Sequence, residues 1–221
     1  MGFQVAVVLV WLTIVALLAE GVNRFTPSNA ELVRKVVHIG SGNVILIAWW
    51  LKIPAWVGVS ASVVFSAIAL LSYYVPILSS INGIGRKSLG TFFYAVSIGV
   101  LVAWFWGLHL PQFAALGVLV MTWGDGFAAI VGQHFGRHPY KLWDMQKTWE
   151  GSTVMALISF ILSLLILLGT QENSWQVWAI SLLVAIAAAS LEAFSKYGID
   201  NLTVPIGSAA IAYFLSQTLL P

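Results

Sequence analysis

The sequence contains no cysteine and very few charged residues. Without cysteine, the chain can form neither a disulfide nor a thiolate nucleophile or metal site. Only 8% of its 221 residues are charged and 60% are hydrophobic, whereas about a quarter of a soluble domain is charged. A net charge of +2 is too small to indicate a nucleic-acid partner. The composition therefore excludes a soluble globular protein and predicts one embedded in a lipid bilayer.

Long apolar runs follow one another along the whole chain. A bilayer crossing takes roughly 20 apolar residues in a helix, so a chain of this length supplies about seven or eight helices and little else. We predict an all-α, polytopic integral membrane protein in which residues 1–221 form a single helical bundle domain. The expected helices cover residues 3–19, 37–51, 54–72, 91–106, 110–131, 153–169, 175–193 and 203–220.

The charged residues lie almost entirely in alternate loops. By the positive-inside rule, the loops that carry the basic residues face the cytoplasm, or the equivalent side of an internal membrane. Seven of the eight acidic residues, all except Glu172, lie on the same side, although the rule does not require it. We therefore predict a polar site at the cytoplasmic ends of the helices. Only Lys52 lies on the far side, and the other basic residues are Arg24, Arg34, Lys35, Arg86, Lys87, Arg137, Lys141, Lys147 and Lys196.

Residues 122–152 combine charged side chains with small ones. Asp125 ends a long apolar run, and a carboxylate at that depth usually faces a bundle interior, an ion or a polar substrate. Gly132 and Gly136 follow Asp125 at helical spacing, where small side chains admit either a neighbouring helix or a nucleotide. Helix packing alone explains the glycines, but it does not explain Asp125.

Lys147, Glu150 and Gly151 directly precede the next apolar helix. A lysine and the free N–H groups at a helix start both suit phosphate. Asp125 and Glu150 offer hard oxygen ligands, which suit Mg²⁺. The alternative is structural, with a capped helix end and a surface ion pair between Lys147 and Glu150.

Residues 31–43 place a second polar group on the same side. Arg34, Lys35 and His38 recur at helical spacing and form one stripe if the segment is a helix. The stripe indicates either a phosphate-binding surface or interfacial basic residues next to a packed histidine.

Residues 192–205 hold the third polar group, in the loop before the last helix. Asp200 and Asn201 can cap that helix. They can equally complete an acidic site that also contains an amide.

The three groups together resemble the motifs of the polyprenol kinases, a family that includes dolichol, phytol and farnesol kinases. The short chain is more similar in size to the phytol kinases than to the longer dolichol kinases. The family's CTP-binding signature is matched by Asp125-x-x-Ala128-x-x-x-Gly132-x-x-x-Gly136 and Lys147-Thr148-x-Glu150-Gly151. Its other motifs are matched, in the same order, by Arg34-Lys35-x-x-His38 and Asp200-Asn201-Leu202-x-x-Pro205.

The resemblance implies transfer of the γ-phosphoryl group of CTP to the hydroxyl of an isoprenoid alcohol, with Mg²⁺. Phytol is the favoured alcohol, with geranylgeraniol, farnesol or a polyprenol as alternatives and UTP as the alternative donor. The product would feed the synthesis of tocopherol and related prenylquinones. Where the family signature has basic residues ahead of the Lys-Thr pair, this chain has Gln146, which lowers the number of cations near the phosphates.

These considerations assign expected functions to individual residues. Asp125 and Glu150 are expected to bind Mg²⁺, and Lys147 to bind the β and γ phosphates. The general base is expected to be His38 or Asp200. Further nucleotide or phosphate ligands are predicted among Arg34, Lys35, Gly132, Gly136, Thr148, Gly151 and Asn201.

Two other functions stay open at this stage. A membrane cytidylyltransferase would attack the α-phosphate of CTP and release pyrophosphate. A transporter would consume no nucleotide, and it would more often show internal repeats and ionisable residues near the bilayer midplane. The sequence shows no convincing repeat, and its charges lie on one side.

Overall fold

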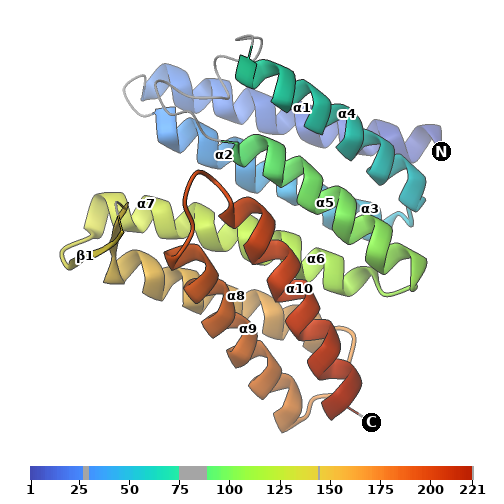
Figure 1. The fold of residues 1–221 in the computed structure, drawn as a ribbon. Helices are drawn as coiled ribbons and strands as arrows, with labels where there is room; N and C mark the ends of the chain where they lie inside the picture. Colours follow the sequence, from blue (N-terminus) through green and yellow to red (C-terminus); the bar gives the residue numbers. More distant parts are fainter. Residues whose placement is uncertain (27–29, 75–88, 144, 221) are drawn as a thin grey trace.

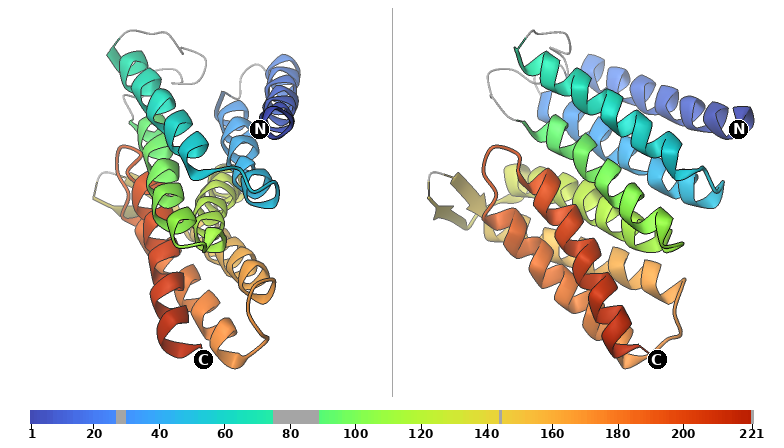
Figure 2. Two further views of the ribbon diagram at one scale, coloured as in Figure 1. Left: turned by 90° about the vertical axis from the view of Figure 1, so that its right-hand side faces the viewer. Right: turned by 45° about the vertical axis from the view of Figure 1, so that its right-hand side comes forward.

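The chain folds into helices that run back and forth along one common direction (Figure 1, Figure 2). This computed structural model describes residues 1–26, 30–74, 89–143 and 145–220. Within these residues, eight helical segments are long and apolar enough to cross a membrane. The predicted all-α, polytopic membrane fold is therefore confirmed. Arg86 and Lys87, which the sequence assigns to the cytoplasmic side, lie outside the described residues.

The order of the elements matches the predicted order of spans. One span is formed by two consecutive helices and another by two helices joined through a π-helix. The elements are α1 (Gly2–Phe25), α2 (Ala30–Gly42), α3 (Val44–Trp50), α4 (Ala55–Tyr74), α5 (Gly90–Gly107), α6 (Pro111–Leu119), the π-helix η1 (Val120–Asp125), α7 (Gly126–Phe135), β1 (Pro139–Leu142), β2 (Met145–Thr148), α8 (Trp149–Leu168), α9 (Trp175–Ala193) and α10 (Asp200–Leu219).

The span formed by α2 and α3 begins earlier than its hydrophobicity predicts. The sequence indicates a helix from residue 37, whereas α2 begins at Ala30 and carries charged residues in its first turns. Arg34 donates two hydrogen bonds, of 2.6 and 3.0 Å, to the carboxylate of Glu31. Lys35 is buried in the bundle. Because these charged groups interact within the protein, the helix begins before the N-terminal start of its apolar run.

An antiparallel hairpin, formed by β1 and β2, replaces the loop that the sequence predicts around Pro139. Its register pairs Pro139 with Thr148 and Leu142 with Met145. Each strand has only four residues, which is too short for a clear alternating pattern, and no Asn-Gly or Asp-Gly turn marks the connection. The hairpin lies outside the membrane spans at one end of the bundle, and β2 leads directly into α8 (Figure 1).

Helix α6 lies at the centre of the bundle. All of its residues from Gln112 to Leu119 are buried, and it packs against α3, α5, α8 and α10. Figure 2 shows this span between the helices of the first half of the chain and α8 to α10. Helix α10 approaches closely because Gly117 has no side chain, and a Cβ there would lie 2.9 Å from the Cβ of Ala209. Small residues at such crossings favour dense packing between membrane helices.

The outer helices expose large apolar side chains. Phe3 and Leu17 on α1, and Val63 and Phe65 on α4, are each more than half exposed on the outside of the bundle. Lipid tails are as apolar as these side chains, so the exposure carries no penalty within a bilayer.

The two ends of the bundle differ in polarity. Both termini lie at the end opposite the hairpin (Figure 1). Helices α1, α7 and α9 end, and α2, α8 and α10 begin, at the hairpin end, whereas Lys52 lies between α3 and α4 at the other end. The fold thus brings the three polar sequence groups together at one end of the helices.

Candidate functional site

The π-helix η1 ends at Asp125 and fixes the position of this carboxylate. π-Helical turns are rare and occur frequently at functional sites. Within η1, the Trp123 indole N–H donates a 3.1 Å hydrogen bond to Oδ1 of Asn43, where α2 gives way to α3. The two segments also pack closely at Gly42, which has no side chain: a Cβ added there would lie only 2.8 Å from the Cβ of Thr122. These contacts fasten η1 to the span that carries the basic stripe.

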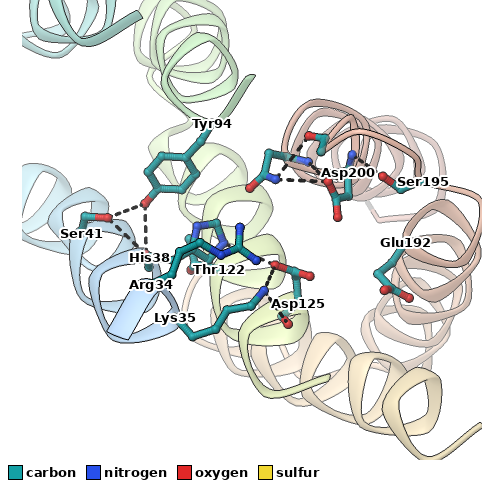
Figure 3. A network of polar contacts seen from close by, with 12 residues as sticks. Arg34, Lys35, His38, Ser41, Tyr94, Thr122, Asp125, Glu192, Ser195 and Asp200 are labelled. Carbon is teal, nitrogen blue, oxygen red and sulfur yellow. Dashed lines mark hydrogen bonds and ion pairs between the residues drawn. The ribbon is translucent and has the colours of Figure 1, made fainter. Parts of the chain in front are cut away.

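Asp125 forms a buried ion pair with Lys35. The Lys35 ammonium donates a 2.6 Å hydrogen bond to Oδ2 of Asp125 and a 3.3 Å bond to its backbone carbonyl. The exposed fractions of the two side chains are 3% for Lys35 and 13% for Asp125. Figure 3 shows the lysine reaching from α2 toward the end of η1. The carboxylate at depth therefore faces the bundle interior, which is one of the three surroundings that the sequence allows.

His38 lies beside this ion pair. Its Nε2 atom is 3.7 Å from Oδ2 of Asp125 and is buried without a hydrogen-bond partner in the part of the chain that the structure describes. The Tyr94 hydroxyl donates a 3.2 Å bond to the backbone carbonyl of His38 and lies 3.0 Å from the Ser41 hydroxyl. The rings of Tyr94 and His38 pack with their centroids 4.8 Å apart. These contacts hold the imidazole with Nε2 toward Asp125 (Figure 3).

Lys147, on β2, forms a second ion pair with Glu192 at the end of α9. Its ammonium donates hydrogen bonds to Oε1 of Glu192 and, at 3.2 Å, to the backbone carbonyl of the same residue. Burial alone would lower the pKa of Lys147, but the neighbouring Glu192 carboxylate more than offsets this effect, so the pKa lies above its ordinary value. Lys147 therefore stays protonated at neutral pH.

Asp200 and Asn201 begin α10 and face the same region. The preceding turn contains Gly198, whose φ of 85° lies in the left-handed region that glycine adopts without strain. The Asp200 N–H donates a 2.7 Å bond to the Ser195 hydroxyl. Oδ1 of Asp200 accepts two bonds from Asn201, of 3.0 Å from its backbone and 3.1 Å from its side chain. The N-cap position of α10 is occupied by Ile199, without a side-chain capping bond, so the capping by Asp200 and Asn201 that the sequence allows is not what forms. The bonds to Asn201 instead orient the Asp200 carboxylate.

These residues together form what we call the polar cluster. Asp200 lies near enough to interact electrostatically with Asp125, Lys35 and Lys147, and Arg34 interacts with both aspartates. The structure therefore unites residues from all three polar sequence groups (Figure 3). The polar cluster consists of Arg34, Lys35, His38, Asp125, Lys147, Glu192, Asp200 and Asn201.

Other residues that the sequence predicts as nucleotide ligands form the junction between α7 and α8. A Cβ on Gly132 would lie 3.0 Å from the Thr148 hydroxyl oxygen, and one on Gly151 would lie 2.9 Å from the Ala128 carbonyl oxygen. Thr148 caps α8 by accepting a 3.1 Å bond from the Gly151 N–H. Gly136 ends α7 next to the Thr148 side chain. Helix packing and capping explain these four residues, and their contacts with nucleotide stay predictions.

Glu150 lies in the first turn of α8 and turns toward the hairpin. One of its carboxylate oxygens is 2.6 Å from Nδ1 of His138, and the other accepts a 3.3 Å bond from the His138 N–H. The surface pair between Lys147 and Glu150 that the sequence allows is not what forms, because Lys147 pairs with Glu192. The function of Glu150 as a metal ligand stays a prediction.

Sequence reasoning gave no individual function to Glu192, Ser195 or Tyr94. Glu192 lies in the last turn of the alanine-rich helix α9, and Lys196, four residues later, is the basic residue nearest to it in the sequence. Its partner Lys147 is 45 residues away, so this pair is visible only in three dimensions. Its one sequence signal is a carboxylate at the end of an apolar run, which is the signal that singled out Asp125. Tyr94 and Ser195 carry no such signal, because isolated hydroxyls are common in membrane helices.

The polar cluster offers oxygen ligands for a divalent cation. Within the described ranges, no three His, Asp or Glu side chains are grouped tightly enough to hold a metal by themselves. Mg²⁺ does not require this, since it commonly uses one or two protein carboxylates together with phosphate oxygens and water. Asp125 and Asp200 are two carboxylates of the polar cluster that interact electrostatically, and the binding of Mg²⁺ there stays a prediction.

The buried ion pair of Lys35 and Asp125 predicts strong coupling between the two residues. Lys35→Met leaves a buried carboxylate without its partner and is expected to cost about 3–5 kcal/mol of stability. Asp125→Asn is milder, because its amide oxygen and backbone carbonyl still accept from Lys35. The double variant should recover much of the loss, measured as the midpoint of thermal unfolding in detergent.

The control for this comparison is Arg24→Gln, which removes an exposed ion pair with Glu20. It should change stability by less than about 1 kcal/mol. Equal effects of Lys35→Met and Arg24→Gln, or strictly additive effects in the double variant, would contradict the buried pair.

Comparison with known proteins relates the chain to isoprenoid alcohol kinases. It is 54% identical to the phytol kinase of Synechocystis sp. over 203 residues, which cover 92% of this chain and 87% of that protein. It is 30% identical to a probable chloroplastic phytol kinase of Triticum aestivum over 211 residues, covering 84% of this chain and 67% of that protein. It is also 27% identical to the chloroplastic farnesol kinase of Arabidopsis thaliana over 211 residues, which cover 85% of this chain and 66% of that protein.

Two further comparisons return nothing: no family model matches the chain, and no solved structure matches it. The match to the Synechocystis protein extends over most of both chains, so the aligned region includes the spans that carry the polar cluster. The chain belongs to the polyprenol kinase family and, within it, is most like the phytol kinases.

Proposed function

We propose that this protein transfers the γ-phosphoryl group of CTP to the hydroxyl of phytol, with Mg²⁺, and releases phytyl monophosphate and CDP. Its family membership makes it a kinase of an isoprenoid alcohol. The observation that carries the proposal is the polar cluster, in which buried and partly exposed carboxylates and cations from five elements converge at one end of an apolar bundle. We propose that this end faces the cytoplasm, or the equivalent side of an internal membrane, because the basic residues gather there.

The position of the polar cluster suits substrates of opposite solubility. A nucleoside triphosphate reaches the ends of the helices from water, whereas an isoprenoid tail stays among apolar side chains in the bilayer. Phosphoryl transfer passes through a loose transition state, so positioning and charge neutralisation matter more than covalent activation. A polar site at the membrane interface can position the substrates and neutralise charge while the nucleotide stays in water and the tail stays in lipid.

The charges of the polar cluster support a requirement for a divalent cation. Its basic residues already face carboxylates: Arg34 pairs with Glu31, Lys35 with Asp125, and Lys147 with Glu192. Asp200 adds a further carboxyl group near these pairs. A triphosphate would therefore meet a region with no net positive charge. Bound Mg²⁺ would supply that charge, with Asp125 as one ligand and Asp200 or Glu150 as the second.

The remaining residues have distinct proposed functions. Lys147 contacts the β and γ phosphates, and Arg34 and Lys35 stabilise charge on the transferred group. His38 takes the proton of the alcohol, because its Nε2 atom is buried beside Asp125 without a hydrogen-bond partner among the described residues. Asp200 is the weaker candidate for the base, because one of its carboxylate oxygens is already bonded to Asn201.

The first test is a kinase assay on the purified protein in nanodiscs. γ-Labelled CTP and Mg²⁺ are incubated separately with phytol, geranylgeraniol, farnesol and a long polyprenol. We expect labelled lipid phosphate, with the highest kcat/KM for phytol and a lower one with UTP as donor. Asp125→Asn should abolish turnover while its thermal unfolding remains cooperative.

Three outcomes change the proposal. A different best alcohol would keep the mechanism and change the substrate. Pyrophosphate release with no transferred γ-label would indicate a cytidylyltransferase. No nucleotide consumption with any alcohol, in a preparation shown to be folded, would refute the kinase assignment.

The second carboxylate of the metal site can be identified by comparing Asp200→Asn with Glu150→Gln. Asp200 interacts electrostatically with Asp125, whereas Glu150 is bonded to His138. We therefore expect Asp200→Asn to raise the Mg²⁺ concentration for half-maximal activity by about 10-fold or more. Glu150→Gln should change it by less than about 3-fold. The reverse ranking would assign the site to Asp125 and Glu150.

The base can be tested with His38→Gln, which keeps the side chain polar but removes the proton acceptor. A general base contributes roughly 10²- to 10⁴-fold to the rate, so kcat should fall within that range while KM for CTP changes little. Tyr94→Phe is the matched control, because it removes the bond to the His38 carbonyl but keeps both the imidazole and the ring that packs against it. A kcat in His38→Gln close to that of the unmodified protein would exclude His38 as the base.

A further inference from the structure

Glu192 stands out among the residues to which the reaction assigns no function. It is only 5% exposed, and it lies near the end of α9 in a region rich in alanine and leucine. A carboxylate in such surroundings is costly unless it has a partner. Its partner is Lys147, which it binds through both the side-chain carboxylate and the backbone carbonyl.

Lys147 lies on a short strand of the hairpin. The hairpin consists of two four-residue strands outside the membrane spans, and a lysine ammonium sits on a flexible four-carbon stem. The hairpin is joined to α8 by a 2.6 Å hydrogen bond between the hydroxyls of Tyr140 and Ser152. The link from Lys147 to Glu192 joins it to α9 and thereby to the polar cluster.

Two other carboxylates compete for the same ammonium. Lys147 interacts electrostatically with Asp125 and Asp200 in addition to Glu192. Without Glu192, the attraction of these aspartates would act on the Lys147 ammonium with no closer carboxylate to oppose it. Glu192 thus fixes the position of one cation and also keeps that cation away from the carboxylates.

We propose that Glu192 is a positioning residue, which holds the Lys147 ammonium at the nucleotide side of the polar cluster and away from Asp125 and Asp200. This inference rests on the proposed function, in which Lys147 binds the β and γ phosphates. Glu192 acts through Lys147 and contacts neither substrate.

The test compares Glu192→Gln, Glu192→Asp and Lys147→Ala with the unmodified protein in nanodiscs. Glu192→Gln should raise KM for CTP by about 10-fold and leave KM for phytol within about 2-fold, because Lys147 serves only the nucleotide. Glu192→Asp, which keeps the charge, should recover part of the loss. The double variant Lys147→Ala/Glu192→Gln should be no worse than Lys147→Ala alone.

A second measurement is independent of activity. Amine acylation followed by mass spectrometry reports how well each lysine is protected, and Lys147 should react several-fold faster in Glu192→Gln. Exposed Lys141, on the other strand of the hairpin, is the internal reference and should not change. If the unmodified protein consumes no CTP, the proposed function fails, while acylation still decides whether Glu192 holds Lys147.

Ser181→Ala is the structural control. Ser181 is buried on the same helix and bonds only to the Val177 carbonyl of its own α9 in the described structure, so its loss reports general damage to that helix. An unchanged KM for CTP in Glu192→Gln, with lower thermal stability alone, would overturn the proposal. A second result would also overturn it: additive effects of the two substitutions in Lys147→Ala/Glu192→Gln, together with a higher Mg²⁺ concentration for half-maximal activity. Such a result would make Glu192 a metal ligand.

Discussion

The buried ion pair between Lys35 and Asp125 is the interaction on which the candidate site depends. It joins two spans whose residues are 90 positions apart in the sequence. Removing two charges from water is costly, and only close geometry with further hydrogen bonds compensates for it. The second bond from Lys35, to the Asp125 backbone carbonyl, and the π-helix that presents that carbonyl provide this geometry. The ion pair therefore fixes how α2 meets the end of η1.

The other polar contacts extend from this pair to the rest of the helix ends. His38 lies against it, Asp200 faces it from α10, and the pair of Lys147 and Glu192 closes the region from the hairpin and α9. Each cation is matched by a carboxylate from another turn or another element. A polyphosphate that binds here would have to replace carboxylates as the partners of these cations. Binding would therefore break existing ion pairs, because no pocket of unpaired cations is present among these residues.

Much of the fold could be predicted from the sequence, because lipid imposes a simple rule on length and hydrophobicity. The eight spans and their order follow from apolar runs, and the one-sided charges predict which ends meet. The start of α2 could not be predicted, since hydrophobicity assigns Glu31 and Arg34 to a loop and does not reveal that they pair. The hairpin was missed because its strands are short and its turn has no strong signal.

The candidate site was predicted unevenly for a related reason. Lys35, His38 and Asp125 stand out because a charge beside an apolar run needs a partner, and the structure supplies one. Glu192 has the same feature, but its partner comes from a hairpin that the sequence does not reveal. Gly132 and Gly151 illustrate the opposite case, since a small residue admits a helix or a ligand equally well and only the packing of α7 on α8 shows which contact forms.

The position of the two termini has a practical consequence for work on this protein. Both lie at the end of the bundle away from the hairpin (Figure 1), and a 20-residue helix spans about 30 Å. An affinity tag or fluorescent fusion at either terminus is therefore held a full bilayer thickness away from the polar cluster. Such a tag leaves access to the site open, whereas a probe meant to report nucleotide arrival has to be attached near the hairpin.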